Sequence, residues 1–257
     1  MNHRREFLIT ILNIASVLSL GHICKSWAWP KGDEEECYLK VGGCNTSSPI
    51  NSSFGCSLSA SAASSLTQMQ LLESCGDRRI DFLINQESRV LADITGFQPG
   101  FAFLNDNGSP NAFATPQQLL GYADGSVLFG VNLVHKEIRS LGPLWDAAVV
   151  FIMAHEWGHI AEYQNGLREN AKEMELLSDY IGGWYLGMKL SSGMRFDPRG
   201  AAKSVFEKGD FNFNDPSHHG TPSERLAATE AGFSLGNLYR ERNFRKAFES
   251  GRMEVGI

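Results

Sequence analysis

The chain has 257 residues, of which 42% are hydrophobic, and a formal net charge of −6. This length and composition are sufficient for one substantial hydrophobic core, or for one domain with an appendage. No cluster of Lys and Arg occurs outside the N-terminus, so the sequence lacks the basic surface typical of nucleic-acid-binding proteins. We therefore expect no nucleic acid among the partners of this protein.

The first 28 residues have the form of an export signal. Arg4 and Arg5 precede an apolar run from Leu8 to Leu20, which is short for a membrane span. The paired arginines resemble a bacterial twin-arginine signal, which exports folded proteins, while an ordinary secretory signal and an uncleaved membrane anchor are the alternatives. A cut after Ala28 is plausible because small residues precede it. We expect a periplasmic or other extracytoplasmic protein, with membrane contact only through an uncleaved signal.

Residues 29–78 form a segment of different composition, with an acidic run and many Ser, Asn and Gly residues. It contains four cysteines, Cys37, Cys44, Cys56 and Cys75. In an exported protein four cysteines indicate two disulfides, and three pairings are possible. A structural zinc site is the competing interpretation, but the paired spacing C-x₂-C is absent. The role of this segment is left open.

Residues 79–257 are expected to form one α+β domain that is mostly helical. A stripe of apolar residues predicts a helix over 79–96, and residues 57–75 are compatible with a further helix. Short β-like runs then predict a small antiparallel sheet, with strands at 101–104, 111–115 and 126–134. From Pro143 onward the pattern is helical. Helices are expected from there to Asn165, then at Glu169–Leu190, Asp197–Gly209, Thr221–Gly232 and Leu235–Phe248.

The strongest chemical signal is the sequence His155-Glu156-Trp157-Gly158-His159 inside the apolar helical stretch. Side chains at i and i+4 lie on the same face of a helix, so the imidazoles of His155 and His159 can reach one metal ion. Glu156 lies about 100° further round the helix, close enough to hold a water molecule at the metal without being a ligand. This H-E-x-x-H pattern is the signature of zinc peptidases.

A catalytic zinc site normally has a third protein ligand, and Glu175 is the candidate here. If the chain turns at Asn165–Gly166 and the next helix folds back, Glu175 comes level with His159. Asp179, one helical turn further, can accept a hydrogen bond from the second nitrogen of a ligating histidine. The alternative is that Glu175 is an ordinary solvated glutamate on a helix surface.

H-E-x-x-H followed by E-x-x-x-D resembles the gluzincin zinc peptidases, and most closely the group of CaaX prenyl proteases and bacterial heat-shock membrane peptidases. The resemblance covers roughly residues 80–232. It includes the segments Asn111–Pro116, His155–His159, Glu175–Asp179 and His219–Arg225. The last segment is also similar to neutral zinc metallopeptidases that end in His-Gly-Thr/Ser and Arg. Those membrane relatives carry several transmembrane helices, whereas this sequence has one apolar run, near its N-terminus.

The resemblance implies a zincin-like fold and roles for further residues. It implies that a strand formed by Asn111, Ala112, Phe113 and Ala114 pairs with an extended substrate. It also implies that His219 assists the oxyanion and that Arg225 holds the site together. From the residues alone, His219 can equally belong to a surface loop, and Arg225 can pair with Asp179, with another carboxylate, or in a plain surface salt bridge.

The predicted function is a zinc-dependent endopeptidase that cleaves peptide bonds of exported or envelope proteins. One Zn²⁺, held by His155, His159 and Glu175, activates a water, and Glu156 is the general base. The partner is a peptide or protein substrate, and the oligomeric state is left open. The main alternative is a zinc-stabilised polypeptide-binding protein or chaperone that does not cleave, and another is a zinc hydrolase acting on a non-peptide amide.

Overall fold

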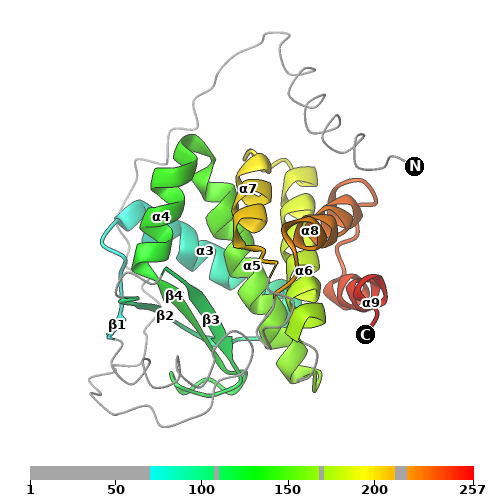
Figure 1. Cartoon of the computed structure of the whole chain (residues 1–257). Coiled ribbons are helices and arrows are strands. Elements are labelled where there is room, and N and C mark those ends of the chain that lie inside the picture. The colour runs from blue at the N-terminus through cyan, green and yellow to red at the C-terminus, as the bar shows by residue number, and fades with distance from the viewer. Residues whose placement is uncertain (1–69, 107–109, 168–170, 212–218) are drawn as a thin grey trace. The chain divides into compact units, whose positions relative to one another are not determined.

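A mixed sheet and a group of packed helices make up the computed structural model, which describes residues 70–257 apart from 107–109, 168–170 and 212–218 (Figure 1). The predicted export signal and Cys37, Cys44 and Cys56 lie outside the described residues. The strands are β1 (Leu71–Leu72), β2 (Gly100–Leu104), β3 (Ala112–Thr115) and β4 (Ser126–Gly130). The helices are α3 (Arg78–Thr95), α4 (Val131–Leu141), the short η1 (Gly142–Leu144), α5 (Trp145–Gln164), α6 (Ala171–Ser191), α7 (Arg199–Lys208), α8 (Pro222–Asn237) and α9 (Phe244–Val255).

The sheet is mixed, so the predicted antiparallel sheet is wrong. Its strand order is β1-β2-β4-β3. Strand β2 runs parallel to β4, with Gly100 opposite Ser126, whereas β1 and β3 are antiparallel to their neighbours. Strand β3 pairs with β4 but not with β2, because the chain returns after β3 to place β4 between them. Strand β3 is therefore an edge strand of the sheet that the described residues form.

Strand β4 ends at Gly130 and is followed by helix α4, so the predicted strand over 126–134 is too long and α4 was missed. The cause is that the start of α4 is capped by a residue distant from it in the sequence. The fully buried carboxylate of Asp106 accepts hydrogen bonds from the backbone N–H groups of Asn132, at 2.8 Å, and Leu133, at 3.0 Å. These are donors of the first helical turn that have no partner within the helix. Asp106 lies 26 residues before Asn132, so a local pattern does not reveal it.

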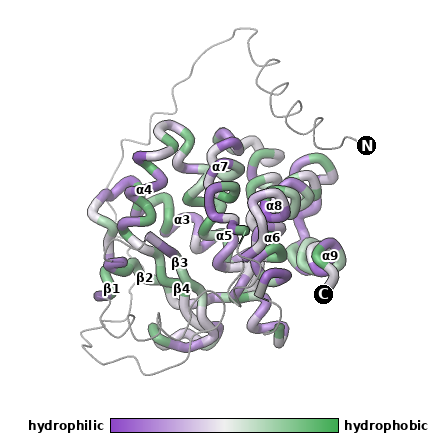
Figure 2. Tube along the Cα trace, viewed as in Figure 1, coloured by the Kyte–Doolittle hydropathy of each residue, from purple (hydrophilic) through white to green (hydrophobic). Residues whose placement is uncertain are grey.

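Helix α5 is buried along nearly its whole length, from Ala147 to Tyr163, as the uniformly apolar run Ala147–Ala154 predicts. Helix α6 packs against α5 on one side and α8 on the other. Close approach depends on glycine, because a Cβ at Gly158 would lie 2.7 Å from Ser178 Oγ and one at Gly182 would lie 2.6 Å from Phe151. Strands β2 and β4 carry mainly hydrophobic residues, as Figure 2 shows.

Helix α8 begins as predicted but is longer than predicted. Thr221 and Glu224 form a capping box at its start, in which the Thr221 side chain accepts from the Glu224 N–H and the Glu224 side chain accepts from the Thr221 N–H. The helix continues past Gly232, which was expected to end it. A Cβ at that position would lie 1.9 Å from the carbonyl oxygen of Tyr180. Gly232 therefore serves helix packing rather than helix termination.

The C-terminal helix begins later than predicted. Asn243 caps it by accepting a hydrogen bond from the Lys246 N–H, so α9 starts at Phe244 and not at Leu235. At the other end of the described chain, residues 71–72 form β1 rather than part of the expected helix over 57–75. Among the described residues, no helix combines the length and apolarity that spanning a membrane requires.

Among the described residues Cys75 is a free and buried thiol. Its predicted disulfide partners, Cys37, Cys44 and Cys56, lie outside the described residues, so the two disulfides stay a prediction. Burial, opposed by a hydrogen bond to the Asp77 carbonyl oxygen, raises its pKa to about 12. Because the thiolate is the reactive form, we expect Cys75 to resist iodoacetamide at pH 8 in the folded protein and to react after unfolding. Peptide mapping by mass spectrometry checks this, and Cys75 recovered in a disulfide would contradict it.

Candidate metal centre

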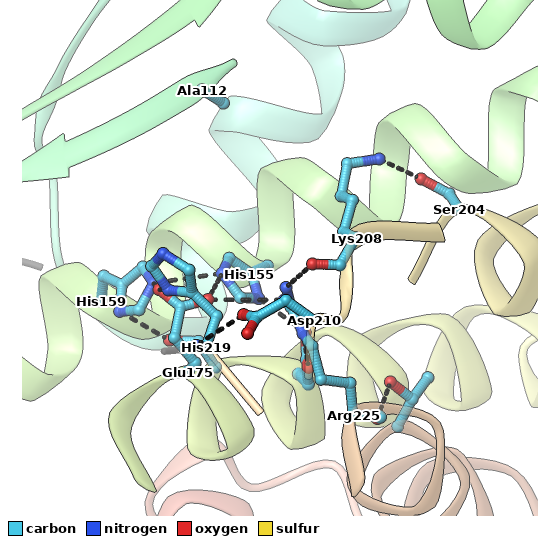
Figure 3. Close-up of polar contacts among 12 residues, drawn as sticks. Ala112, His155, His159, Glu175, Ser204, Lys208, Asp210, His219 and Arg225 are labelled. Carbon is cyan, nitrogen blue, oxygen red and sulfur yellow. Dashed lines mark hydrogen bonds and ion pairs between the residues drawn. The ribbon is translucent and has the colours of Figure 1, made fainter. Parts of the chain in front are cut away.

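Three side chains from two helices converge at one point, which Figure 3 shows in close-up. His155 and His159 lie one turn apart on α5, and their Nε2 atoms are 3.1 Å from each other. Glu175 reaches them from α6, with one carboxylate oxygen 3.5 Å from His155 Nε2 and the other 3.4 Å from His159 Nε2. All three are buried, and their candidate ligand atoms lie within 4.8 Å of one another. This triad can hold a metal ion.

The orientation of His155 is fixed from behind by Asp179. His155 Nδ1 donates to Asp179 Oδ1 at 2.9 Å, which leaves Nε2 as the free nitrogen that faces the other ligands. Asp179 is fully buried, and Arg225 donates to it from Nε at 2.7 Å and from Nη2 at 2.8 Å. Arg225 Nη2 also lies 3.4 Å from Glu175. Both the Asp179 contact and the Arg225 pairing expected from the sequence are present.

His159 is oriented by a residue that sequence reasoning missed. Its Nδ1 donates to Glu162 Oε2 at 2.7 Å, and Ser178 donates to the other oxygen of Glu162 at 3.0 Å. The position of Glu162 three residues after His159, on a helix that the apolar run Ala147–Ala154 predicts to be buried, was the available signal, because a buried glutamate needs a partner.

We expect Glu162→Gln to weaken divalent metal binding by roughly 10–100-fold, because partners of this kind orient ligating histidines and raise their basicity. Titration of the metal-free protein with zinc, followed by calorimetry, measures the affinity. Glu173→Gln is the matched control, since Glu173 lies on α6 outside the cluster. Equal zinc affinity for Glu162→Gln and the unchanged protein would show that Glu162 does not act through His159.

The charges around the triad favour a cation at its centre. Burial lowers the pKa of His155, but hydrogen bonds with Asp179 and Glu175 outweigh it and raise the value to about 9. Burial has the same effect at His159, where the charge of Glu162 overcomes it and the pKa rises well above its ordinary value. Glu175 responds in the opposite way, since hydrogen bonds from both histidines overcome burial and hold its pKa well below normal. Positive charge is therefore stabilised where the Nε2 atoms meet.

Glu156 faces the same cavity but stands apart from the hydrogen-bond network. It is 6% exposed and lines a cavity of about 210 Å³ together with the triad. Among the described residues no hydrogen-bond partner of its carboxylate is found, and burial raises its pKa. The carboxylate is thus available to a molecule in the cavity.

His219 also reaches the centre, as the resemblance implied. Its Nδ1 lies 3.2 Å from Glu175 Oε1, and its side chain is one-quarter exposed. The residue is held at the end of its loop by Asp210, which accepts from the His219 N–H at 3.2 Å and donates its own N–H to Gly220 at 3.1 Å. His218 lies outside the described residues.

Part of the strand expected to bind substrate forms one wall of the cavity. Asn111 and Ala112 line it, whereas Phe113 packs into the hydrophobic cluster of the sheet and Ala114 lies further along the strand. Among the described strands β3 pairs only with β4. It also contacts α5, and the side-chain oxygen of Asn111 accepts a hydrogen bond from the Ala112 N–H at 3.0 Å. The Tyr163 hydroxyl donates to the Ala114 carbonyl oxygen at 3.4 Å, which links β3 to α5.

Comparisons of this chain with protein-family models, with curated proteins and with solved structures find no match.

Proposed function

We propose that this protein is a zinc-dependent endopeptidase of the gluzincin type. One observation carries the proposal: His155, His159 and Glu175 converge in a cavity that is also lined by Glu156 and by Ala112 of the edge strand β3. Two imidazole nitrogens and one carboxylate are a ligand set typical of catalytic zinc, which keeps a position open for water or substrate. When bound there, zinc supplies Lewis acidity and activates water at neutral pH.

The chain's own residues account for proton transfer and orientation. Glu156 accepts a proton from the attacking water at its free carboxylate and later delivers it to the leaving amine. Asp179 and Glu162 keep both histidines in the tautomer that leaves Nε2 unprotonated in the neutral ring. His219, beside Glu175 and partly exposed, donates a hydrogen bond to the oxyanion of the tetrahedral intermediate.

The edge strand β3 gives the substrate a place to bind. An extended peptide pairs with β3 at Ala112, beside Asn111, where the strand lines the cavity, and its backbone thereby crosses the cavity in front of the triad. Binding through the backbone suits a protease that accepts protein substrates. Exported or envelope proteins are the proposed substrates because residues 1–28 have the form of an export signal.

The test is cleavage of casein and of a peptide library by the zinc-loaded protein, with fragments identified by mass spectrometry. We expect peptide-bond cleavage that stops when 1,10-phenanthroline removes zinc and returns when zinc is restored. Binding of unfolded chains without any fragments would instead support the zinc-stabilised binding protein. Release of a product from a non-peptide amide, with peptides left intact, would support a different zinc hydrolase.

A further inference from the structure

The cavity that contains the triad is also lined by two lysines from different helices. Lys136 comes from α4 and Lys208 from α7, and neither has a part in holding the metal ligands. In Figure 3 the ammonium group of Lys208 extends away from the histidine cluster toward Ser204. The cavity therefore has a metal end and a separate cationic region.

The hydrogen-bond donors of the Lys208 ammonium group are only partly used within the protein. Its ammonium group donates to Glu137 Oε1 at 2.6 Å and to Ser204 Oγ at 2.5 Å, and its side chain is 31% exposed. An ammonium group has three donors, so one remains for a further acceptor. Burial lowers the pKa of Lys208, the Glu137 charge opposes this, and the nearby charges of Lys136 and Arg225 add to the effect of burial.

Lys136 is exposed and has no hydrogen-bond or ion-pair partner among the described residues. The acidic residues that line the cavity, Glu156 and Glu175, both belong to the metal end. Glu137 is buried next to Lys208 and does not line the cavity. It therefore compensates the charge of Lys208 and leaves the charge of Lys136 without a counter-charge. The remaining lining here is neutral and consists of residues such as Leu133 and Val205.

We propose that Lys136 and Lys208 bind a carboxylate of the substrate near the scissile bond, so that the enzyme prefers acidic peptides. This inference rests on the proposed peptidase function. An ammonium donor that faces a partly desolvated cavity forms a strong, charge-assisted hydrogen bond with a carboxylate. The carboxylate comes either from an Asp or Glu side chain within the peptide or from the C-terminus of the peptide.

The experiment measures binding separately from cleavage. Fluorescent peptides with an amidated C-terminus carry Glu or Gln at successive positions, and a third set carries no acidic side chain but a free C-terminus. Their affinities for zinc-loaded Glu156→Gln protein are measured by fluorescence anisotropy. We expect one carboxylate-containing set to bind about tenfold more tightly than the neutral peptides. The set that gains affinity identifies the source of the carboxylate.

Variants assign the preference to the lysines. Lys136→Glu, at an exposed position that tolerates the change, is expected to abolish the tenfold preference. Arg139→Glu makes the same charge change on α4 outside the cavity lining and is expected to preserve it. Equal binding of acidic and neutral peptides would overturn the inference, and so would a preference that survives Lys136→Glu.

Cleavage by the zinc-loaded wild-type protein separates this inference from the proposed function. Cleavage of acidic and neutral peptides with the same kcat/KM, together with equal binding, means that the inference fails and the peptidase function stands. Carboxylate-dependent binding that Lys136→Glu abolishes, without cleavage of any peptide, means that the lysine site stands and the peptidase function fails.

Discussion

Glu156→Gln is expected to abolish peptide cleavage while zinc remains bound. Glutamine has the shape of glutamate but cannot take a proton from water, so the general-base contribution, about 10²–10⁴-fold in rate, is lost. The metal ligands should be undisturbed, because within the described chain Glu156 has no hydrogen bond to His155, His159 or Glu175. The measurements are kcat/KM on a fluorogenic peptide and zinc content by mass spectrometry.

Glu173→Gln provides the matched control for this variant. It makes the same chemical change on α6, two residues before Glu175, but Glu173 does not line the cavity. It should keep both zinc and cleavage. If Glu156→Gln cleaved peptides at the wild-type rate with zinc bound, Glu156 would not be the base. If it lost zinc as well, its carboxylate would have to contribute to the metal site itself.

The geometry of the candidate metal centre was largely predictable because the positions of its residues are set by helix periodicity. The four-residue spacing of His155 and His159 fixes a shared face on any helix. Glu175 required one more step, the assumption that a short connection after Asn165 turns the chain back. In the structure α6 packs against α5, and Asp179, one turn after Glu175, contacts His155. Rules based on sequence spacing are sufficient to place site residues that lie on one helix, or on two helices joined by a short loop.

The features that were not predicted depend on contacts between segments that are distant in the sequence. The start of α4 is capped by Asp106, and the order of β2, β3 and β4 depends on which strand lies at the sheet edge. Neither feature produces a periodic pattern in the sequence. The predicted strand was therefore extended over the start of α4, and the sheet was predicted to be antiparallel. The lysine region of the cavity was missed for the same reason, because α4 and α7 meet only in the folded chain.

A buried ion pair away from the candidate metal centre predicts the largest effect on stability. Lys189 on α6 donates to both carboxylate oxygens of Glu87 on α3, at 2.5 and 2.6 Å, and the hydroxyl of Tyr185 donates to the same carboxylate. Glu87 is 2% exposed and Lys189 is 7% exposed. Neither charge can regain its water without opening the contact between these helices, so each depends on the other.

Lys189→Met is therefore expected to lower the free energy of unfolding by about 3–5 kcal/mol, because it leaves the Glu87 carboxylate buried without a counter-charge. Guanidinium denaturation followed by circular dichroism measures the change. Adding Glu87→Gln to Lys189→Met should recover much of the loss, since a neutral amide can still accept from Tyr185.

Lys203→Met is the matched control for Lys189→Met, because Lys203 is half exposed and lies 4.0 Å from Glu207 across one helical turn. Such a solvated pair contributes little, so the stability should hardly change. Equal losses from Lys189→Met and Lys203→Met would mean that the buried pair has no special weight. A large loss at Lys189 alone, reversed by Glu87→Gln, would show that the cost comes from the unpaired carboxylate, and hence that α6 is held to α3 at the end of α6 opposite Glu175 and Asp179.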